Sequence, residues 1–154
     1  MALAWITQVK NDSAAAFTLL QNDPSKHPVC NGRQYRQDEP IRVPPGATMD
    51  FSWFVIPWRD YGRLLVRGPG GEVAWQVGPS EGGGTDVLQG RSAGGVVQNI
   101  RLGDAGGPFT AEQLEFRLHA TKGGIAFEST GSVGRILSLD WGPKLIGRVL
   151  ALVG

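Results

Sequence analysis

The chain has 154 residues, which is the length of a single domain and enough to enclose a sizeable hydrophobic core. Its 15 basic and 14 acidic residues leave a formal net charge of +1 at pH 7, without an extended basic tract. Nucleic-acid binders gather Lys and Arg to hold the phosphate backbone, so we expect no nucleic-acid partner. A nearly uncharged chain instead favours a neutral ligand such as a small molecule, a glycan or a lipid.

Glycine and proline set the local pattern of the sequence. The chain contains 23 Gly and 10 Pro, and this glycine content is about twice the usual share of roughly 7%. These residues interrupt the chain every few positions and leave little room for long helices. The segments between them alternate apolar and polar residues, which is typical of β-strands with one buried face.

The N-terminal segment lacks the basic stretch and the apolar stretch of a secretory signal. No uncharged apolar run reaches the roughly 18 residues of a transmembrane helix. The nearest candidate, 136–153, contains Asp140, Lys144 and Arg148. Cys30 is the single cysteine, so no internal disulfide can form. We therefore expect a cytoplasmic protein without a transmembrane segment, with export by another route left open.

In the first half of the chain, alternation and turn residues predict strands at 3–9, 17–20, 41–43, 49–58 and 64–66. The first two strands are expected to pair as a hairpin across the turn at 11–13. Residues 21–40 contain three prolines and the dipeptide Asn31-Gly32, which favours a two-residue turn. That stretch is predicted to be a long surface loop containing one short hairpin.

The segment 49–58 is the most apolar part of the chain. One of its faces carries alternating apolar residues from Met49 onward, and from Phe54 the opposite face is apolar as well. A strand that is apolar on both faces lies at the centre of a sheet or between two layers. Pro57 cannot donate to a β-ladder, so we expect it at the end of this strand or at a bulge.

In the second half, the same signals predict strands at 73–77, 87–88, 96–102, 114–120, 125–127 and 135–141, then a last strand or short helix at 145–153. Glycine-rich turns at 68–71 and 122–124 are expected to close hairpins. The total is about nine to eleven short strands with turns at intervals of roughly 8–12 residues. This spacing predicts a single all-β domain over 1–154, either an antiparallel β-sandwich of the jelly-roll type or a closed β-barrel.

Trp58, Arg59, Asp60 and Tyr61 are the first candidate for a ligand site, since they follow the most apolar strand and precede a glycine. Exposed aromatic rings can stack on the apolar face of a sugar while an Arg and an Asp bind its hydroxyl groups. The same side chains would suit a lipid headgroup at a membrane surface. The structural alternative is that Trp58 belongs to the core and that Arg59 and Asp60 form a surface ion pair.

His119 alternates with Glu115 and Arg117 along one face of the strand predicted at 114–120. In a closed barrel with a polar lumen, these three side chains could act as acid–base residues toward an enclosed ligand. In a sandwich, the same alternation marks the solvent face of a half-buried strand.

The sequence gives no indication of a metal or cofactor. His27 and Cys30 lie three residues apart in a loop, but two ligands do not form a zinc site and no second pair follows. The glycine-rich segments match neither a phosphate-binding loop nor a dinucleotide fingerprint. No nucleophile motif of the form GxSxG is present either.

Three functions are compatible with these features. The first is non-catalytic, lectin-like binding of a neutral carbohydrate or a lipid headgroup, favoured by five tryptophans and a near-zero net charge. The second is a small β-barrel enzyme, a cyclase or isomerase that holds a hydrophobic molecule in an internal cavity. The third is a structural or assembly subunit in which 145–153 forms an interface. A homodimer is compatible with the first function as well as the third.

Overall fold

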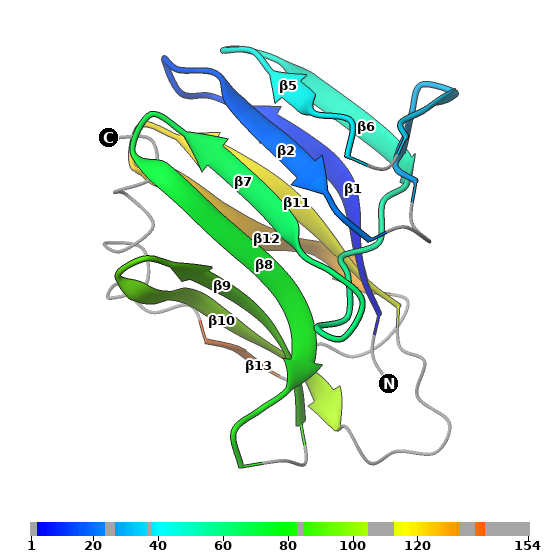
Figure 1. Ribbon diagram of the computed structural model, residues 1–154, viewed down its shortest axis with the longest axis vertical. Coiled ribbons are helices and arrows are strands. Elements are labelled where there is room, and N and C mark those ends of the chain that lie inside the picture. The colour runs from blue at the N-terminus through cyan, green and yellow to red at the C-terminus, as the bar shows by residue number, and fades with distance from the viewer. Residues whose placement is uncertain are drawn as a thin grey trace.

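The computed structural model describes residues 3–23, 27–36, 38–82, 85–104, 113–132 and 138–140, and every regular element among them is a β-strand. The strands form two sheets that pack face to face as a β-sandwich, and Figure 1 looks onto one sheet with the other behind it. Each sheet ends in edge strands, so the described strands form no closed barrel. The predicted sandwich is therefore confirmed, and the closed-barrel alternative is wrong.

The six-stranded sheet lies at the back of Figure 1 and has the order β12-β11-β1-β6-β3-β4. β1 pairs in parallel with β11, whereas its other neighbour, β6, is antiparallel to it. The N-terminal strand thus lies inside the sheet, beside a segment from the last third of the chain. The strands of this sheet are β1 (Leu3–Asn11), β3 (Val29–Cys30), β4 (Arg33–Gln34), β6 (Thr48–Trp53), β11 (Gln113–Thr121) and β12 (Gly124–Ser132).

The seven-stranded sheet faces the viewer in Figure 1 and has the order β13-β10-β9-β8-β7-β2-β5. Neighbouring strands in it are antiparallel. The hairpins predicted at 68–71, 31–32 and 122–124 are present as β7–β8, β3–β4 and β11–β12. The strands of this sheet are β2 (Phe17–Gln21), β5 (Ile41–Val43), β7 (Leu64–Gly68), β8 (Gly71–Pro79), β9 (Thr85–Ser92), β10 (Gly95–Asp104) and β13 (Ser138–Asp140).

The predicted hairpin between the first two strands is wrong, because β1 and β2 lie in opposite sheets. The turn-forming residues after β1 instead make a corner between the two layers. Asn11 is fully buried at this corner, where its Nδ2 donates to the carbonyl oxygens of Ala15 at 2.9 Å and Val43 at 3.1 Å. Its Oδ1 accepts a hydrogen bond from the N–H of Ser13 at 3.0 Å. A buried amide must be hydrogen-bonded at both ends, and these bonds fix the corner.

The apolar segment 49–58 forms two structures rather than one continuous strand. β6 covers its first part and lies between β1 and β3, as expected of a central strand. The rest crosses from one sheet to the other: the N–H of Ile56 donates to Ala4 on β1 at 2.9 Å, and the N–H of Val77 on β8 donates to Pro57 at 2.9 Å. A segment that runs between two layers meets apolar surroundings on both sides, which explains its sequence.

Aromatic side chains fill much of the space between the sheets. Trp75 on β8 is fully buried, and its ring meets that of Phe127 on β12 edge-on, with the ring centroids 4.6 Å apart. The Trp75 ring also lies against the backbone of Gly90 on β9, where an added Cβ atom would be 2.7 Å from the indole. A side chain at position 90 would overlap the indole, so this close approach requires glycine.

The end of the chain is described in part. The strand predicted at 135–141 is seen at its described residues as β13. The segment 145–153, expected as a last strand, a short helix or an interface, lies outside the described residues.

Candidate functional site

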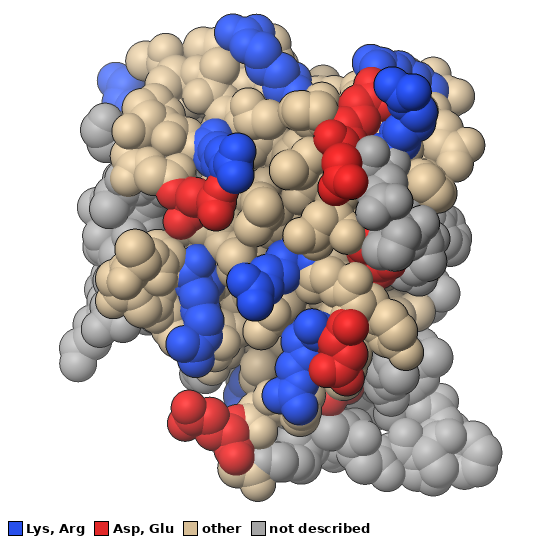
Figure 2. All heavy atoms as spheres, in the orientation of Figure 1, with Lys and Arg blue, Asp and Glu red and all other residues tan. Residues whose placement is uncertain are grey.

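A broad groove of about 810 Å³ lies on the outer face of the seven-stranded sheet, over β8, β9 and β10. Its volume falls within the range of roughly 300–1,000 Å³ that is usual for small-molecule sites. Figure 2 shows this face of the molecule, where basic side chains are spread among uncharged ones and acidic side chains lie beside several of them. The lining comes from the three strands, from the loop after β8, and from Arg59.

Three amide side chains form a row across this groove. On β8, Gln76 lies between the buried residues Trp75 and Val77, so its side chain points away from the core. The strand register places Gln76 opposite Gln89 on β9, and Gln89 opposite Asn99 on β10. Neighbouring strands are about 4.8 Å apart, so this amide row (Gln76, Gln89 and Asn99) spans about 10 Å.

Arg91 borders the amide row on one side. It lies two residues after Gln89 on β9, and therefore on the same face of the sheet. Its Nε donates to Oε1 of Gln89 at 2.8 Å, which orients the guanidinium and leaves the NH₂ group of Gln89 as a donor. Within the described part of the chain, Arg91 forms no ion pair.

Arg59 borders the amide row on the opposite side. Its side chain lies across Gly78 on β8, where an added Cβ atom would be 3.0 Å from Cδ and 3.4 Å from Cγ of Arg59. Gly78 follows Gln76 by two residues, so the aliphatic part of Arg59 lies two residues beyond the amide row along β8. The missing side chain at position 78 leaves the space that Arg59 occupies.

The rest of the lining is mixed in character. Val87 and Val96 contribute apolar surface, and Glu81 is the single acidic residue among the described residues that line the groove. No aromatic ring belongs to this described lining. The groove therefore offers hydrogen-bonding groups and positive charge, not a stacking platform.

The structure separates the four residues of the first predicted site, 58–61. Trp58 is half-buried and packs against the core, while Arg59 lines the groove. Asp60 is exposed and lies 3.8 Å from Nε of Arg59. Tyr61 is 67% exposed and lies outside the described groove lining.

The amide row was not predicted from the sequence. An outward Gln or Asn on a strand is typical of any solvated face. The three amides come from three strands, and only the strand register places them in one row. The alternation within each strand was the available signal, but it does not identify which strands are neighbours.

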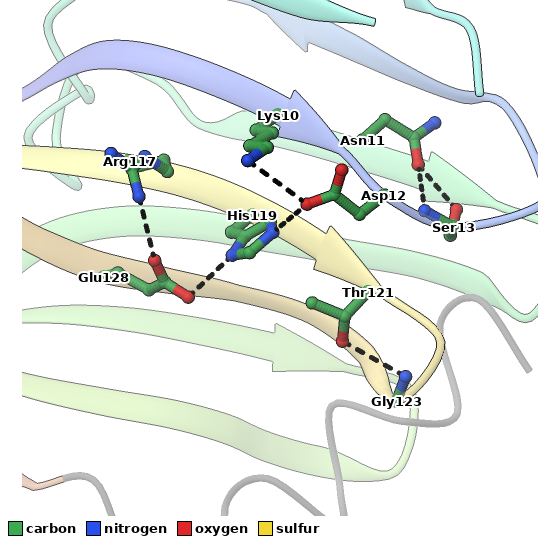
Figure 3. Close-up of polar contacts among 9 residues, drawn as sticks. All are labelled: Lys10, Asn11, Asp12, Ser13, Arg117, His119, Thr121, Gly123 and Glu128. Carbon is green, nitrogen blue, oxygen red and sulfur yellow. Dashed lines mark hydrogen bonds and ion pairs between the residues drawn. The ribbon is translucent and has the colours of Figure 1, made fainter. Parts of the chain in front are cut away.

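The second predicted group lies on the outer face of the six-stranded sheet, where Figure 3 shows a chain of polar contacts. Nδ1 of His119 is 2.8 Å from a carboxylate oxygen of Glu128, and Nε2 is 2.7 Å from a carboxylate oxygen of Asp12. Arg117 lies 3.6 Å from Glu128, and Lys10 lies 3.6 Å from Asp12. These five residues, the His119 network, join the end of β1 to β11 and β12.

The contacts of His119 suit a structural role better than proton transfer to a substrate. A general base needs a ring nitrogen that can accept a proton from the substrate, and both nitrogens here already face carboxylates. A neutral imidazole donates one hydrogen bond, whereas an imidazolium donates two, so a protonated His119 satisfies both partners. The hydrogen bond from His119 also lowers the pKa of the Asp12 carboxyl below its ordinary value. Among the described contacts, Glu115 takes no part in this network.

The His27 and Cys30 pair forms no metal site in the structure. Cys30 is buried on β3, and this burial raises the pKa of its thiol, so the thiolate form that binds metals is disfavoured. Across the residues that the structure describes, no group of three His, Cys, Asp or Glu side chains could hold a metal ion. The same residues include no helix capable of crossing a lipid bilayer.

No family model, no curated protein and no solved structure matches the chain. What the protein binds is therefore inferred from the chemistry of its own surface.

Proposed function

We propose that the protein is a non-catalytic carbohydrate-binding domain and that its ligand lies along the amide row. The observation that carries this proposal is the alignment of Gln76, Gln89 and Asn99 on three neighbouring strands at the groove. Each amide group has both a donor and an acceptor, and a sugar hydroxyl group has both as well. Oε1 of Gln89 already accepts from Arg91 and Oδ1 of Asn99 is buried, so the row pairs with successive hydroxyl groups of one ligand mainly by donating from its NH₂ groups.

The position of the row favours specific binding. The three amides belong to strands of one sheet, so the backbone ladder fixes their spacing before a ligand arrives. A site that is already in place loses less conformational entropy on binding than a site on flexible loops. The two valines beside the row can contact the C–H groups of a sugar ring.

A membrane-surface ligand, the other form of the expected binding function, has less support. Tyr61 is the one large hydrophobic side chain that is exposed among the described residues. Proteins that lie on a bilayer insert an apolar face of several residues, and one isolated ring does not provide such a face. A polar ligand in the groove agrees better with this surface.

The enzyme and assembly alternatives also lack support. The barrel enzyme required an enclosed lumen, and the described strands form two open sheets. The assembly role depended on 145–153, which the structure does not describe. Oligomeric state and cellular location remain predictions.

The test is a glycan-array screen of the full chain, followed by calorimetric titration with the oligosaccharide that binds best. Gln76→Ala removes one amide from the row and should weaken binding about three- to tenfold, the usual effect of losing one neutral hydrogen bond. Gln8→Ala removes an amide from β1 in the opposite sheet, where Gln8 bonds Asp50, and should leave the affinity within about twofold. The proposal fails if no glycan binds, or if the two variants weaken binding equally.

A further inference from the structure

The basic residues that point outward from the described strands of the seven-stranded sheet are all arginines. Arg42 lies between two buried residues on β5, and Arg101 lies between two buried residues on β10. Arg67 on β7 and Arg91 on β9 are exposed and follow buried residues, so they point outward as well. A guanidinium is a planar group that binds carboxylates and other oxyanions through two parallel hydrogen bonds, which an ammonium cannot do.

The outward arginines of the strands, and Arg59 in the groove lining, differ in how far neighbouring acids neutralise their charge. Arg67 forms an ion pair with Glu72 on the adjacent strand. Arg91 contacts the neutral amide of Gln89 and no acid within the described residues, so its terminal nitrogens can bind an anion. Arg59 faces Asp60 at 3.8 Å, with side chains 51% and 70% exposed, and such an exposed pair is weak in water.

The two arginines that line the groove, Arg91 and Arg59, lie on opposite sides of the amide row. Arg91 lies opposite Ala74, which is two residues before Gln76 on β8. The aliphatic part of Arg59 lies over Gly78, which is two residues after Gln76. The two arginines are therefore separated by about four residues along the strand direction, or roughly 13 Å. The described lining also contains one carboxylate, that of Glu81, so the two guanidinium groups leave it with a net positive charge.

We infer that the ligand is an acidic oligosaccharide whose hydroxyl groups bind the amide row and whose anionic groups bind Arg91 and Arg59. This inference rests on the proposed carbohydrate-binding function and names its ligand class. The anionic group is a carboxylate or a sulfate, because both are oxyanions that a guanidinium binds in the same bidentate way. The chain is nearly neutral as a whole, but the charge beside the ligand is set locally by these two side chains.

Single-stranded nucleic acid, which is also anionic, fits the groove less well. Proteins that bind single strands stack the bases on aromatic side chains. The described lining has no aromatic ring, and its central feature is a row of neutral amides. A ligand with many hydroxyl groups and a few charges agrees better with this arrangement.

The experiment compares each acidic oligosaccharide with its uncharged counterpart. A glycan array carrying uronic-acid, sulfated and neutral oligosaccharides identifies the acidic glycan that binds best. Titration then measures its affinity and that of the same glycan after carboxyl reduction or desulfation. We expect the acidic form to bind about tenfold more tightly at low salt, and this ratio to fall as salt is added.

Variants assign the preference to particular residues. Arg91→Gln removes one of the two guanidinium groups that share the preference, so it should reduce the acidic-to-neutral affinity ratio about threefold. Arg59→Gln removes the other guanidinium of the groove lining and should reduce the ratio by a similar factor. Arg42→Gln removes an arginine on the same face outside the groove lining and is the matched control. Near-UV circular dichroism of the tryptophans, which include the buried Trp75, verifies that each variant is folded.

The outcomes separate this inference from the proposed function. If neutral glycans bind as tightly as acidic ones, the protein binds carbohydrate and the acidic ligand class is wrong. If Arg91→Gln and Arg42→Gln reduce the ratio equally, the general charge of the face causes the preference and the groove assignment is wrong. If no glycan of any class binds, the proposed function itself fails. Binding of the uronic-acid glycans alone, or of the sulfated glycans alone, identifies the anionic group.

Discussion

The side-chain amide of Gln98 on β10 forms two hydrogen bonds with the backbone of Phe127 on β12. Nε2 of Gln98 donates to the carbonyl oxygen at 3.0 Å, and the N–H of Phe127 donates to Oε1 at 2.9 Å. Gln98 is 1% exposed and belongs to the sheet opposite to that of Phe127. Among the described strands β12 lies at the edge of its sheet, so the amide of Gln98 pairs with backbone groups that no other described strand pairs with.

Replacement of Gln98 by Leu should destabilise the protein by about 2–4 kcal/mol. The substitution introduces an apolar side chain of similar size and leaves the N–H and C=O groups of Phe127 buried and unpaired, at about 1–3 kcal/mol each. Urea unfolding, followed by tryptophan fluorescence, measures the change in the free energy of unfolding. Gln89→Leu replaces the outward amide on the neighbouring strand and should change the free energy by less than about 0.5 kcal/mol. Equal effects of the two substitutions would show that the pairing with Phe127 is not stabilising.

Replacement of Gly90 by Ala should destabilise the protein by about 1–3 kcal/mol, because overpacking a core forces side chains and backbone to shift. The new methyl group would lie 2.7 Å from the ring of Trp75, which is fully buried and cannot move freely. The near-UV circular dichroism of the tryptophans should change together with the urea midpoint. Gly82→Ala introduces the same methyl group where no atom lies within 4 Å, and it should have little effect. A Gly90→Ala protein as stable as the unmodified one would contradict the packing described for Trp75.

The pKa of Asp12 should depend on His119. The hydrogen bond from His119 is the largest cause that lowers the pKa of Asp12 from its ordinary value of 3.8, and the charge of Lys10 adds to it. Because the pKa is lower in the folded state, the ionised carboxylate stabilises the fold above the unfolded value, and this contribution is lost as the pH falls through the folded pKa. Acidification below pH 3.8 should therefore weaken the contact between the end of β1 and β11.

Carboxyl-carbon NMR titration of the His119→Ala variant provides the measurement. We expect the pKa of Asp12 to rise toward its ordinary value, because the largest cause that lowers it is removed. His27→Ala, which removes the other histidine of the chain, is the control and should leave the pKa of Asp12 where it is. An unchanged Asp12 pKa in the His119→Ala protein would contradict the hydrogen bond between these two side chains.

Local patterns located most of the described strands and the tight hairpins. The alternation of apolar residues in 73–77 and 114–120 depends on neighbours two positions apart, so it can be recognised without knowledge of the rest of the fold. The glycines at 68–71 and the dipeptide Asn31-Gly32 specify tight turns for the same local reason. The structure has strands at these positions and turns between them.

The errors arose where a local signal had two structural outcomes. The turn residues after β1 are compatible with a hairpin and also with a corner between the two sheets. The hydrogen bonds from Asn11 to Ala15 and Val43 stabilise the corner. The apolar segment 49–58 suits a long central strand, but its second part crosses between the sheets. In both cases the deciding contacts come from residues that are distant in the sequence or in the opposite layer.

The sequence by itself determined the all-β class and the approximate strand positions, because alternation and turn chemistry act between near neighbours. Only the tertiary structure decided which strands are neighbours. It placed β1 beside β11, turned Gln98 inward to Phe127, and aligned Gln76 with Gln89 and Asn99. Strand pairing is set by the burial of whole faces and by contacts across the chain. A row of three amides on three strands is therefore a property of the folded sheet and of no single segment.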